Sequence, residues 1–153
     1  MLVQTMERHR SAVNALALGV DGKVLYSGAC DRSVVVWERG GGGGDGRMEA
    51  TGTLRGHRKA ILCLAAAGDV VCSGSADRTV RVWRRGAEST NYTCLAVLEG
   101  HGAPVKSLAL VYGRDRGSSG TGGGSALVCS GAMDGEVKIW SVLVPCLLER
   151  YQQ

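Results

Sequence analysis

The fold is decided by the stretch SGSADRTVRVW, residues 73–83, because its pattern occurs three times in the chain. SGACDRSVVVW at 27–37 and SGAMDGEVKIW at 130–140 keep the Ser, the Asp and the Trp at the same spacing. One histidine precedes each copy, at His9, His57 and His101, and the chain has no further histidine or tryptophan. A fixed order of four residue types that recurs in this way indicates a structural repeat.

The spacing of the repeat predicts small antiparallel sheets. The histidines are 48 and 44 residues apart, near the length of a four-stranded propeller blade. Val-rich and Leu-rich runs with little alternation are typical of strands covered on both faces. We expect strands at 12–18, 23–28, 33–37 and 48–54, then at 60–66, 69–74, 79–83 and 93–98, and finally at 104–111, 126–131, 136–141 and 146–151.

These strands predict an all-β, partial β-propeller over residues 1–153, with three four-stranded blades as repeats at 9–54, 57–98 and 101–151. Residues 1–8 align with the segments that precede His57 and His101, so we expect them to form the outer strand of a preceding blade. A propeller ring needs about four to eight blades. Three blades therefore predict a fragment of a longer protein, which is the interpretation we favour, or a chain that pairs with a second copy or completes another propeller in trans.

Composition narrows the class of protein further. Among 153 residues, 44% are hydrophobic and the formal net charge is only +4, which is mild for a nucleic-acid-binding domain. The six cysteines include no C-x-x-C pair and lie mostly in apolar runs, so we expect free, buried thiols. No Cys or His falls at metal-ligand spacing, and no metal or cofactor is predicted. The first residues lack the apolar stretch of a signal peptide, so we expect an intracellular protein of the cytoplasm, the nucleus or both.

The combination of Gly-His, Ser-Gly-x-x-Asp and Trp resembles the WD-repeat β-propeller family. The resemblance implies a hydrogen-bonded relay inside each blade, in which Asp accepts from His, His bonds Ser, and Ser bonds the Trp ring N–H. Two departures are visible: Arg8 precedes His9 where Gly is usual, and Glu38, Arg84 and Ser141 replace the Asp that often follows the Trp. The relays carried over by position are His9, Ser27, Asp31 and Trp37; His57, Ser73, Asp77 and Trp83; and His101, Ser130, Asp134 and Trp140.

A narrower resemblance is carried by residues 25–37, 56–64 and 94–101. These stretches are similar to the JINGUBANG-type WD-repeat proteins of plants, which have seven repeats, and this chain resembles their C-terminal portion. The family implies a non-catalytic, regulatory scaffold for protein–protein interactions. The alternative is a substrate-targeting domain within a kinase or ubiquitin-ligase assembly.

The triplet of His, Ser and Asp also raises the question of a hydrolase. A catalytic triad occurs once and exposes its Ser, whereas this set occurs three times and would be covered by a Trp each time. We therefore expect no enzyme and no catalytic residue. Nucleic-acid binding is disfavoured as well, because no aromatic residue interleaves with the basic ones to stack on bases.

We expect the functional residues to lie beside the relay, which holds the loop before each blade and the turn after its second strand. The residue five positions after each His varies between Asn14, Leu62 and Lys106, as suits a contact position. Basic residues are in excess on this face, which favours an acidic segment of a protein partner. The loops at 40–44 and 113–125 are expected on the opposite face. The candidate partner-binding residues are Arg10, Asn14, Arg32, Arg58, Lys59, Leu62, Arg78 and Lys106.

Overall fold

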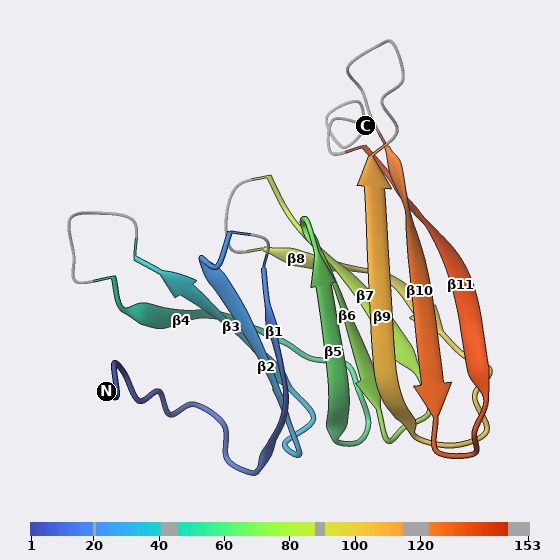
Figure 1. The fold of residues 1–153 in the computed structure, drawn as a ribbon, viewed down its shortest axis with the longest axis horizontal. Helices are drawn as coiled ribbons and strands as arrows, with labels where there is room; N and C mark the ends of the chain where they lie inside the picture. Colours follow the sequence, from blue (N-terminus) through green and yellow to red (C-terminus); the bar gives the residue numbers. More distant parts are fainter. Residues whose placement is uncertain (20, 41–45, 88–90, 115–122, 147–153) are drawn as a thin grey trace.

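The computed structural model describes residues 1–19, 21–40, 46–87, 91–114 and 123–146. Eleven strands in this part of the chain form three antiparallel sheets (Figure 1). Blade one contains β1 (Val13–Leu18), β2 (Val24–Ala29), β3 (Val34–Arg39) and β4 (Met48–Leu54). Blade two contains β5 (Ile61–Ala67), β6 (Val70–Ser75), β7 (Val80–Arg85) and β8 (Tyr92–Leu98). Blade three contains β9 (Val105–Arg114), β10 (Gly124–Ala132) and β11 (Val137–Val144).

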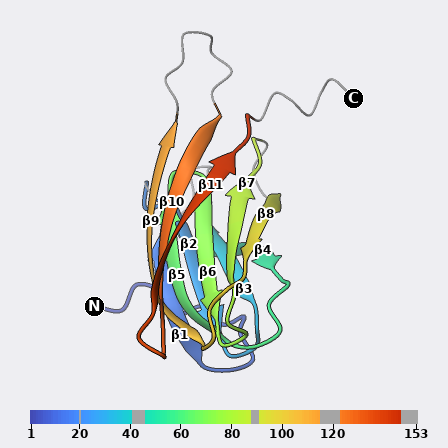
Figure 2. The ribbon, with the colours of Figure 1, turned by 90° about the vertical axis from the view of Figure 1, so that its right-hand side faces the viewer.

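The strands of each blade follow one another in sequence order from the inside outwards. This all-β arrangement of consecutive sheets confirms the predicted partial propeller. The described part of the chain contains no helix long and apolar enough to cross a membrane. Figure 2 shows the three sheets stacked face to face, with blade two between the other two.

Each interface between blades is an apolar layer rich in Val side chains. Val36 and Ile61 are fully buried between blades one and two, and Val82 and Val105 are fully buried between blades two and three. In blades one and two, the Gly of the Ser-Gly pair is needed for this close approach. A Cβ on Gly74 would lie 2.8 Å from the Val105 side chain and closer still to the Cys63 sulfur.

Three sequence predictions need correction or fall outside the described residues. Residues 1–8 form no strand, because a strand needs a hydrogen-bonded neighbour and Gln4 instead uses its side-chain amide to bond both backbone polar groups of Met48. β9 and β10 extend into the predicted loop at 113–125, because Gly113 and Arg114 pair with Ser125 and Gly124. The fourth strand expected at 146–151 lies almost wholly outside the described residues. Within the described residues, blade three has three strands.

Cys30, Cys63, Cys72, Cys94 and Cys129 are free, as expected, but not uniformly buried. Cys63 and Cys72 are buried between blades two and three, and this burial raises the pKa of both thiols to about 12. Cys30 is exposed instead, because its neighbour in the turn, Asp31, is the residue that the relay directs inwards.

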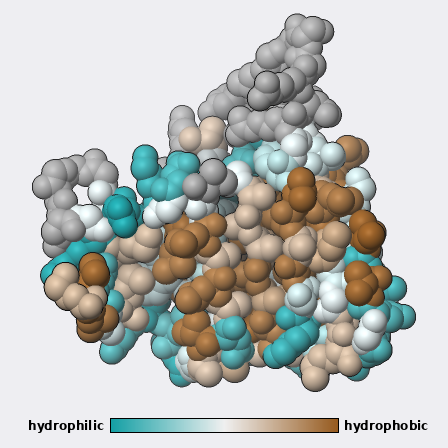
Figure 3. Space-filling view, viewed as in Figure 1, coloured by the Kyte–Doolittle hydropathy of each residue, from teal (hydrophilic) through white to brown (hydrophobic). Residues whose placement is uncertain are grey.

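The outer face of blade three is apolar and exposed. Val137 and Ile139 are 72% and 69% exposed, whereas their repeat equivalents in blades one and two are at most 1% exposed. Figure 3 shows hydrophobic side chains extending over this blade. At the other end of the stack, Leu16 and Leu18 of blade one are 64% and 63% exposed. We call these surfaces the third-blade end face (Leu127, Val137, Ile139 and Leu143) and the first-blade end face (Val13, Leu16 and Leu18).

Candidate functional site

The relay is complete in blade two. His57 Nδ1 lies 2.8 Å from Asp77 Oδ2, and His57 Nε2 lies 2.8 Å from Ser73 Oγ. Trp83 Nε1 donates to the same Ser73 Oγ at 3.0 Å. Burial lowers the pKa of His57, so its ring is neutral at pH 7. Nδ1–H then donates to Asp77, and the Ser73 hydroxyl donates to Nε2 while accepting from Trp83, which uses every polar hydrogen once.

The carboxylate of Asp77 also closes the turn that follows β6. Its Oδ1 accepts from Thr79 N at 2.9 Å and Thr79 Oγ1 at 2.7 Å, while Oδ2 accepts from Arg58 N at 3.0 Å. Burial raises the pKa of Asp77, but the hydrogen bonds from Thr79, Arg58 and His57 outweigh burial and lower the pKa to about 2. These bonds hold Arg78 at a φ of 73°, a left-handed conformation that is uncommon for residues other than glycine.

Blade one repeats this geometry. His9 Nδ1 lies 2.9 Å from Asp31 Oδ2 and Nε2 lies 2.7 Å from Ser27 Oγ, which also accepts from Trp37 Nε1 at 2.8 Å. Ser33 Oγ supports Asp31 Oδ1 at 2.7 Å, as Thr79 supports Asp77. Burial opposes ionisation of Asp31, but the bonds from Ser33, His9 and Arg10 lower its pKa to about 2.

The relay of blade three is incomplete, which corrects the sequence prediction. His101 Nε2 lies 2.7 Å from Ser130 Oγ, and Trp140 Nε1 donates to that oxygen at 2.8 Å. The expected bond from His101 Nδ1 to Asp134 is not formed, and this nitrogen has no hydrogen-bond partner among the described residues. The reason lies two residues after the Asp, where Glu136 replaces the hydroxyl residue of the other blades. Among the described residues, Asp134 Oδ1 accepts from the Glu136 N–H alone, at 3.0 Å.

An open pocket of about 690 Å³ lies beside the relay of blade one. Arg10 and Arg32, both predicted from the sequence, line it together with Arg8 and Arg55, which the prediction missed. All four side chains are exposed, and none forms an ion pair with a described residue. The only carboxylate in the lining belongs to Asp31, which is engaged in the relay.

A second pocket of about 320 Å³ lies on the same side, at the relay turn of blade two. Arg58 and Arg78, two of the candidate partner-binding residues, line it, and Arg81 joins them with its guanidinium carbon 5.9 Å from the centre of the Trp83 ring. Glu99 adds one negative charge to this lining. We call Arg8, Arg10, Arg32, Arg55, Arg58 and Arg78 the basic rim.

The remaining candidate contact residues behave differently from one another. Lys59 and Lys106 are exposed, and Leu62 is half-buried. Asn14 donates from Nδ2 to the Ile61 carbonyl oxygen at 2.9 Å, so its side chain ties blade one to blade two. The structure therefore places Asn14 in the interface between blades, a role that the variability of its position did not indicate.

The opposite end of the blades has a different charge pattern. A pocket of about 460 Å³ there is lined by Asp21, Lys23 and Arg39 among others, with acids and bases mixed. Glu38 Oε1 and Arg85 Nη2 in the same lining form an ion pair at 2.6 Å. This lining therefore mixes acidic and basic side chains, whereas the lining beside the relay of blade one holds four arginines and the single carboxylate of Asp31.

Stacked antiparallel sheets, two of them held by a complete relay of His, Ser, Asp and Trp and the third by its His, Ser and Trp, define a β-propeller scaffold. The family model for the WD domain, G-beta repeat, matches residues 1–38, 48–84 and 92–141, and the chain belongs to this family. Repeats of this family generally form scaffolds for protein–protein interactions. No curated protein matches the chain.

Proposed function

We propose that the basic rim binds an acidic segment of a partner protein. The observation that carries this proposal is the pocket of blade one, in which four arginines gather around a carboxylate that is already engaged. Like charges gathered without counter-charges repel one another, and a bound anion relieves that repulsion. Arginine also binds carboxylates and phosphates through two parallel N–H bonds, which gives the site geometric selectivity.

The relay supports this function by fixing where the arginines stand. Arg10 and Arg58 donate their backbone N–H groups to Asp31 and Asp77. Arg32 and Arg78 occupy the left-handed position of the same turns, with φ values of 71° and 73°. The backbone of these residues is therefore held rigidly, and little backbone entropy is lost when a partner binds.

The test is the binding of a fluorescein-labelled polyglutamate peptide, followed by fluorescence anisotropy. A triple variant, Arg10→Gln, Arg32→Asn and Arg55→Gln, keeps a residue at position 32 that tolerates the left-handed conformation. We expect a loss of affinity between about threefold and about 150-fold, since each of the three exposed charge pairs contributes roughly 0.2–1 kcal/mol. The wild-type affinity should also fall as salt is raised.

The matched control for this test carries Lys23→Gln and Arg39→Gln at the opposite end of the blades. Both residues are exposed basic residues, so the control changes the net charge without touching the basic rim. Equal losses in the two variants would show that only net charge matters and would contradict the proposal. Unchanged binding in the triple variant would contradict it as well.

We further propose a regulatory, intracellular scaffold of the kind that the JINGUBANG-type resemblance implies. The free thiols of Cys63, Cys72 and Cys129 support this setting, because disulfides persist mainly in oxidising compartments. Fluorescent tagging of the chain in plant cells is the measurement. Signal in the cytoplasm or nucleus is expected, and accumulation in the secretory pathway would contradict the proposal.

We also propose that the two end faces bind one another between two copies of the chain. Support comes from continuity with the interfaces inside the chain: the positions of Val137 and Ile139 correspond to Val34 and Val36, which blade two buries completely. Leu16 of blade one corresponds to Leu64, which packs in that same interface. The first blade of a second copy thus offers the kind of face that covers this surface elsewhere.

Light scattering after size-exclusion chromatography tests this pairing. The wild-type chain should elute with twice the monomer mass, and Ile139→Lys should shift it to the monomer. Lys138→Gln, on the opposite side of the same strand, is the control and should leave the mass unchanged. A folded wild-type monomer at all concentrations would overturn the pairing.

A further inference from the structure

Blade three holds a buried imidazole with one nitrogen unsatisfied. The His101 side chain is fully buried, and its Nδ1 has no hydrogen-bond partner among the described residues. In blades one and two the equivalent nitrogen bonds the relay Asp at 2.9 and 2.8 Å. Leaving a buried polar atom unpaired costs free energy. A ligand that binds this nitrogen removes that cost, whereas a ligand at the equivalent nitrogen of blade one or two would have to displace an existing hydrogen bond.

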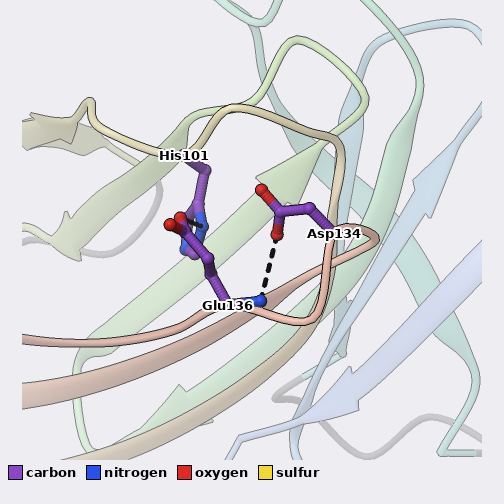
Figure 4. A group of neighbouring side chains, drawn as sticks. All are labelled: His101, Asp134 and Glu136. Atoms are coloured by element: carbon purple, nitrogen blue, oxygen red, sulfur yellow. Dashed lines mark hydrogen bonds and ion pairs between the residues drawn. The ribbon is translucent and has the colours of Figure 1, made fainter.

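Two carboxylates face this nitrogen. Glu136 Oε2 lies 3.9 Å from His101 Nδ1, and one ligand atom each from His101, Asp134 and Glu136 lie within 4.8 Å of one another. Figure 4 shows the Glu136 carboxylate beside the His101 ring and Asp134 on the same turn. Among the described residues this is the one group of three or more potential metal ligands.

We propose that His101, Asp134 and Glu136 bind a divalent transition-metal cation, with Zn²⁺ as the best match. One imidazole nitrogen and two carboxylate oxygens form a donor set that Zn²⁺ accepts at bond lengths of about 2.0–2.2 Å. The buried imidazole is the fixed ligand, and the exposed carboxylates have the freedom to close the remaining distance. Water completes the coordination, because both carboxylates lie at the surface.

The surroundings of the imidazole allow this change of partner. For Nδ1 to bind a cation, the ring proton must reside on Nε2 and donate to Ser130 Oγ. That oxygen already accepts from Trp140 Nε1 at 2.8 Å, and a hydroxyl oxygen has two lone pairs. A hydrogen bond of this kind from the second ring nitrogen is the usual support of a metal-bound histidine.

The charge of a neighbouring lysine competes with the metal. Lys138 Nζ lies 3.5 Å from Glu136 Oε2, so it offsets part of the negative charge on which the metal depends. Replacing Lys138 by Met keeps the apolar stem of the side chain and removes this charge. The Lys138→Met variant should therefore bind Zn²⁺ more tightly than the wild type.

The experiment is equilibrium dialysis of the full chain against Zn²⁺ after treatment with a chelator. We expect about one bound Zn²⁺ per chain for the wild type. Glu136→Thr gives blade three the hydroxyl residue that blade two has at the equivalent position, Thr79. This variant should therefore fold while its Zn²⁺ affinity falls at least about tenfold. Glu136→Gln retains the side-chain size and should lose affinity as well. Glu49→Gln removes an exposed carboxylate of blade one and should bind Zn²⁺ like the wild type.

A second readout locates the ion. The His101 and Trp140 rings are 6.4 Å apart, so paramagnetic Co²⁺ at this site should quench Trp140 fluorescence in the wild type and not in Glu136→Thr. Tighter Zn²⁺ binding in Lys138→Met is the third expected result. Absence of Zn²⁺ uptake by the wild type, or equal uptake by the wild type and both Glu136 variants, would overturn the proposal.

Discussion

Removal of the Ser73 hydroxyl is the most informative perturbation of the relay. Ser73 is fully buried, and its Oγ is the one oxygen of the described residues that bonds both Trp83 Nε1, at 3.0 Å, and His57 Nε2, at 2.8 Å. Ser73→Ala therefore leaves one buried donor and one buried acceptor without partners in the described structure. The methyl group of Ala fits the space of the Ser side chain, so packing changes little.

The expected loss follows from these two groups. A buried polar group left unsatisfied costs about 1–3 kcal/mol, so the pair costs about 2–6 kcal/mol before any relaxation. We expect a measured loss of about 3 kcal/mol in the free energy of unfolding, because partial entry of water relieves the upper part of that range. In a domain of this size such a loss lowers Tm by about 6–12 °C.

Urea denaturation followed by circular dichroism measures this loss, and a double-mutant cycle assigns it to the relay. Trp83→Phe removes the donor. In that background, Ser73→Ala should therefore lower the free energy of unfolding by at least about 1 kcal/mol less than it does in the wild type. Ser107→Ala, at an exposed position of β9, is the control and should stay within about 0.5 kcal/mol of the wild type. A loss below that limit for Ser73→Ala, or an equal loss in both backgrounds, would refute the reasoning.

Two further predictions concern pH and packing. Because the folded-state pKa of His57 is lowered, the unfolded chain binds the extra proton first, and stability should fall as pH drops below about 6.5. Asp77, whose folded-state pKa is lowered to about 2, contributes stability above about pH 4 that is lost as pH falls towards 2. Urea midpoints measured across pH should show both stages, and a flat profile between pH 7 and 5 would contradict the first. Gly74→Ala should cost about 1–3 kcal/mol, because its methyl group meets Val105 across the blade interface. Gly113→Ala has open space around it and should be tolerated in the same assay.

The blades could be predicted from the sequence because the features that define them are local and repeated. The Ser, Asp and Trp of each copy lie on one hairpin, so their spacing along the chain nearly determines their spacing in space. The segment at 1–8 could not be predicted in this way. A strand depends on a partner that the sequence of the segment does not specify, and Gln4 bonds Met48 through its side chain instead.

The candidate site was harder to predict, because single substitutions and distant segments shape it. Glu136 occupies the position that Ser33 and Thr79 fill in the other blades, and this one change separates His101 from Asp134. The relay motif does not include that position, so the motif alone could not reveal the difference. Arg8 and Arg55 precede two of the relay histidines, one directly and one across Gly56. Their joint place in one pocket arises inside blade one, where the pairing of β4 with β3 brings Arg55 beside the turn that holds Arg32. Their similar position in the repeat was a signal that could have been used.

The central claim is that the relay is structural and that the basic rim beside it binds an acidic partner. Titration of the isotope-labelled chain with polyglutamate peptide, followed by NMR of its backbone amides, tests this claim most directly. The account predicts that the shifts concentrate at Arg10, Arg32 and Arg55, with no change at Lys23 and Arg39. Shifts centred on Lys23 and Arg39, or spread evenly over the surface, would contradict it.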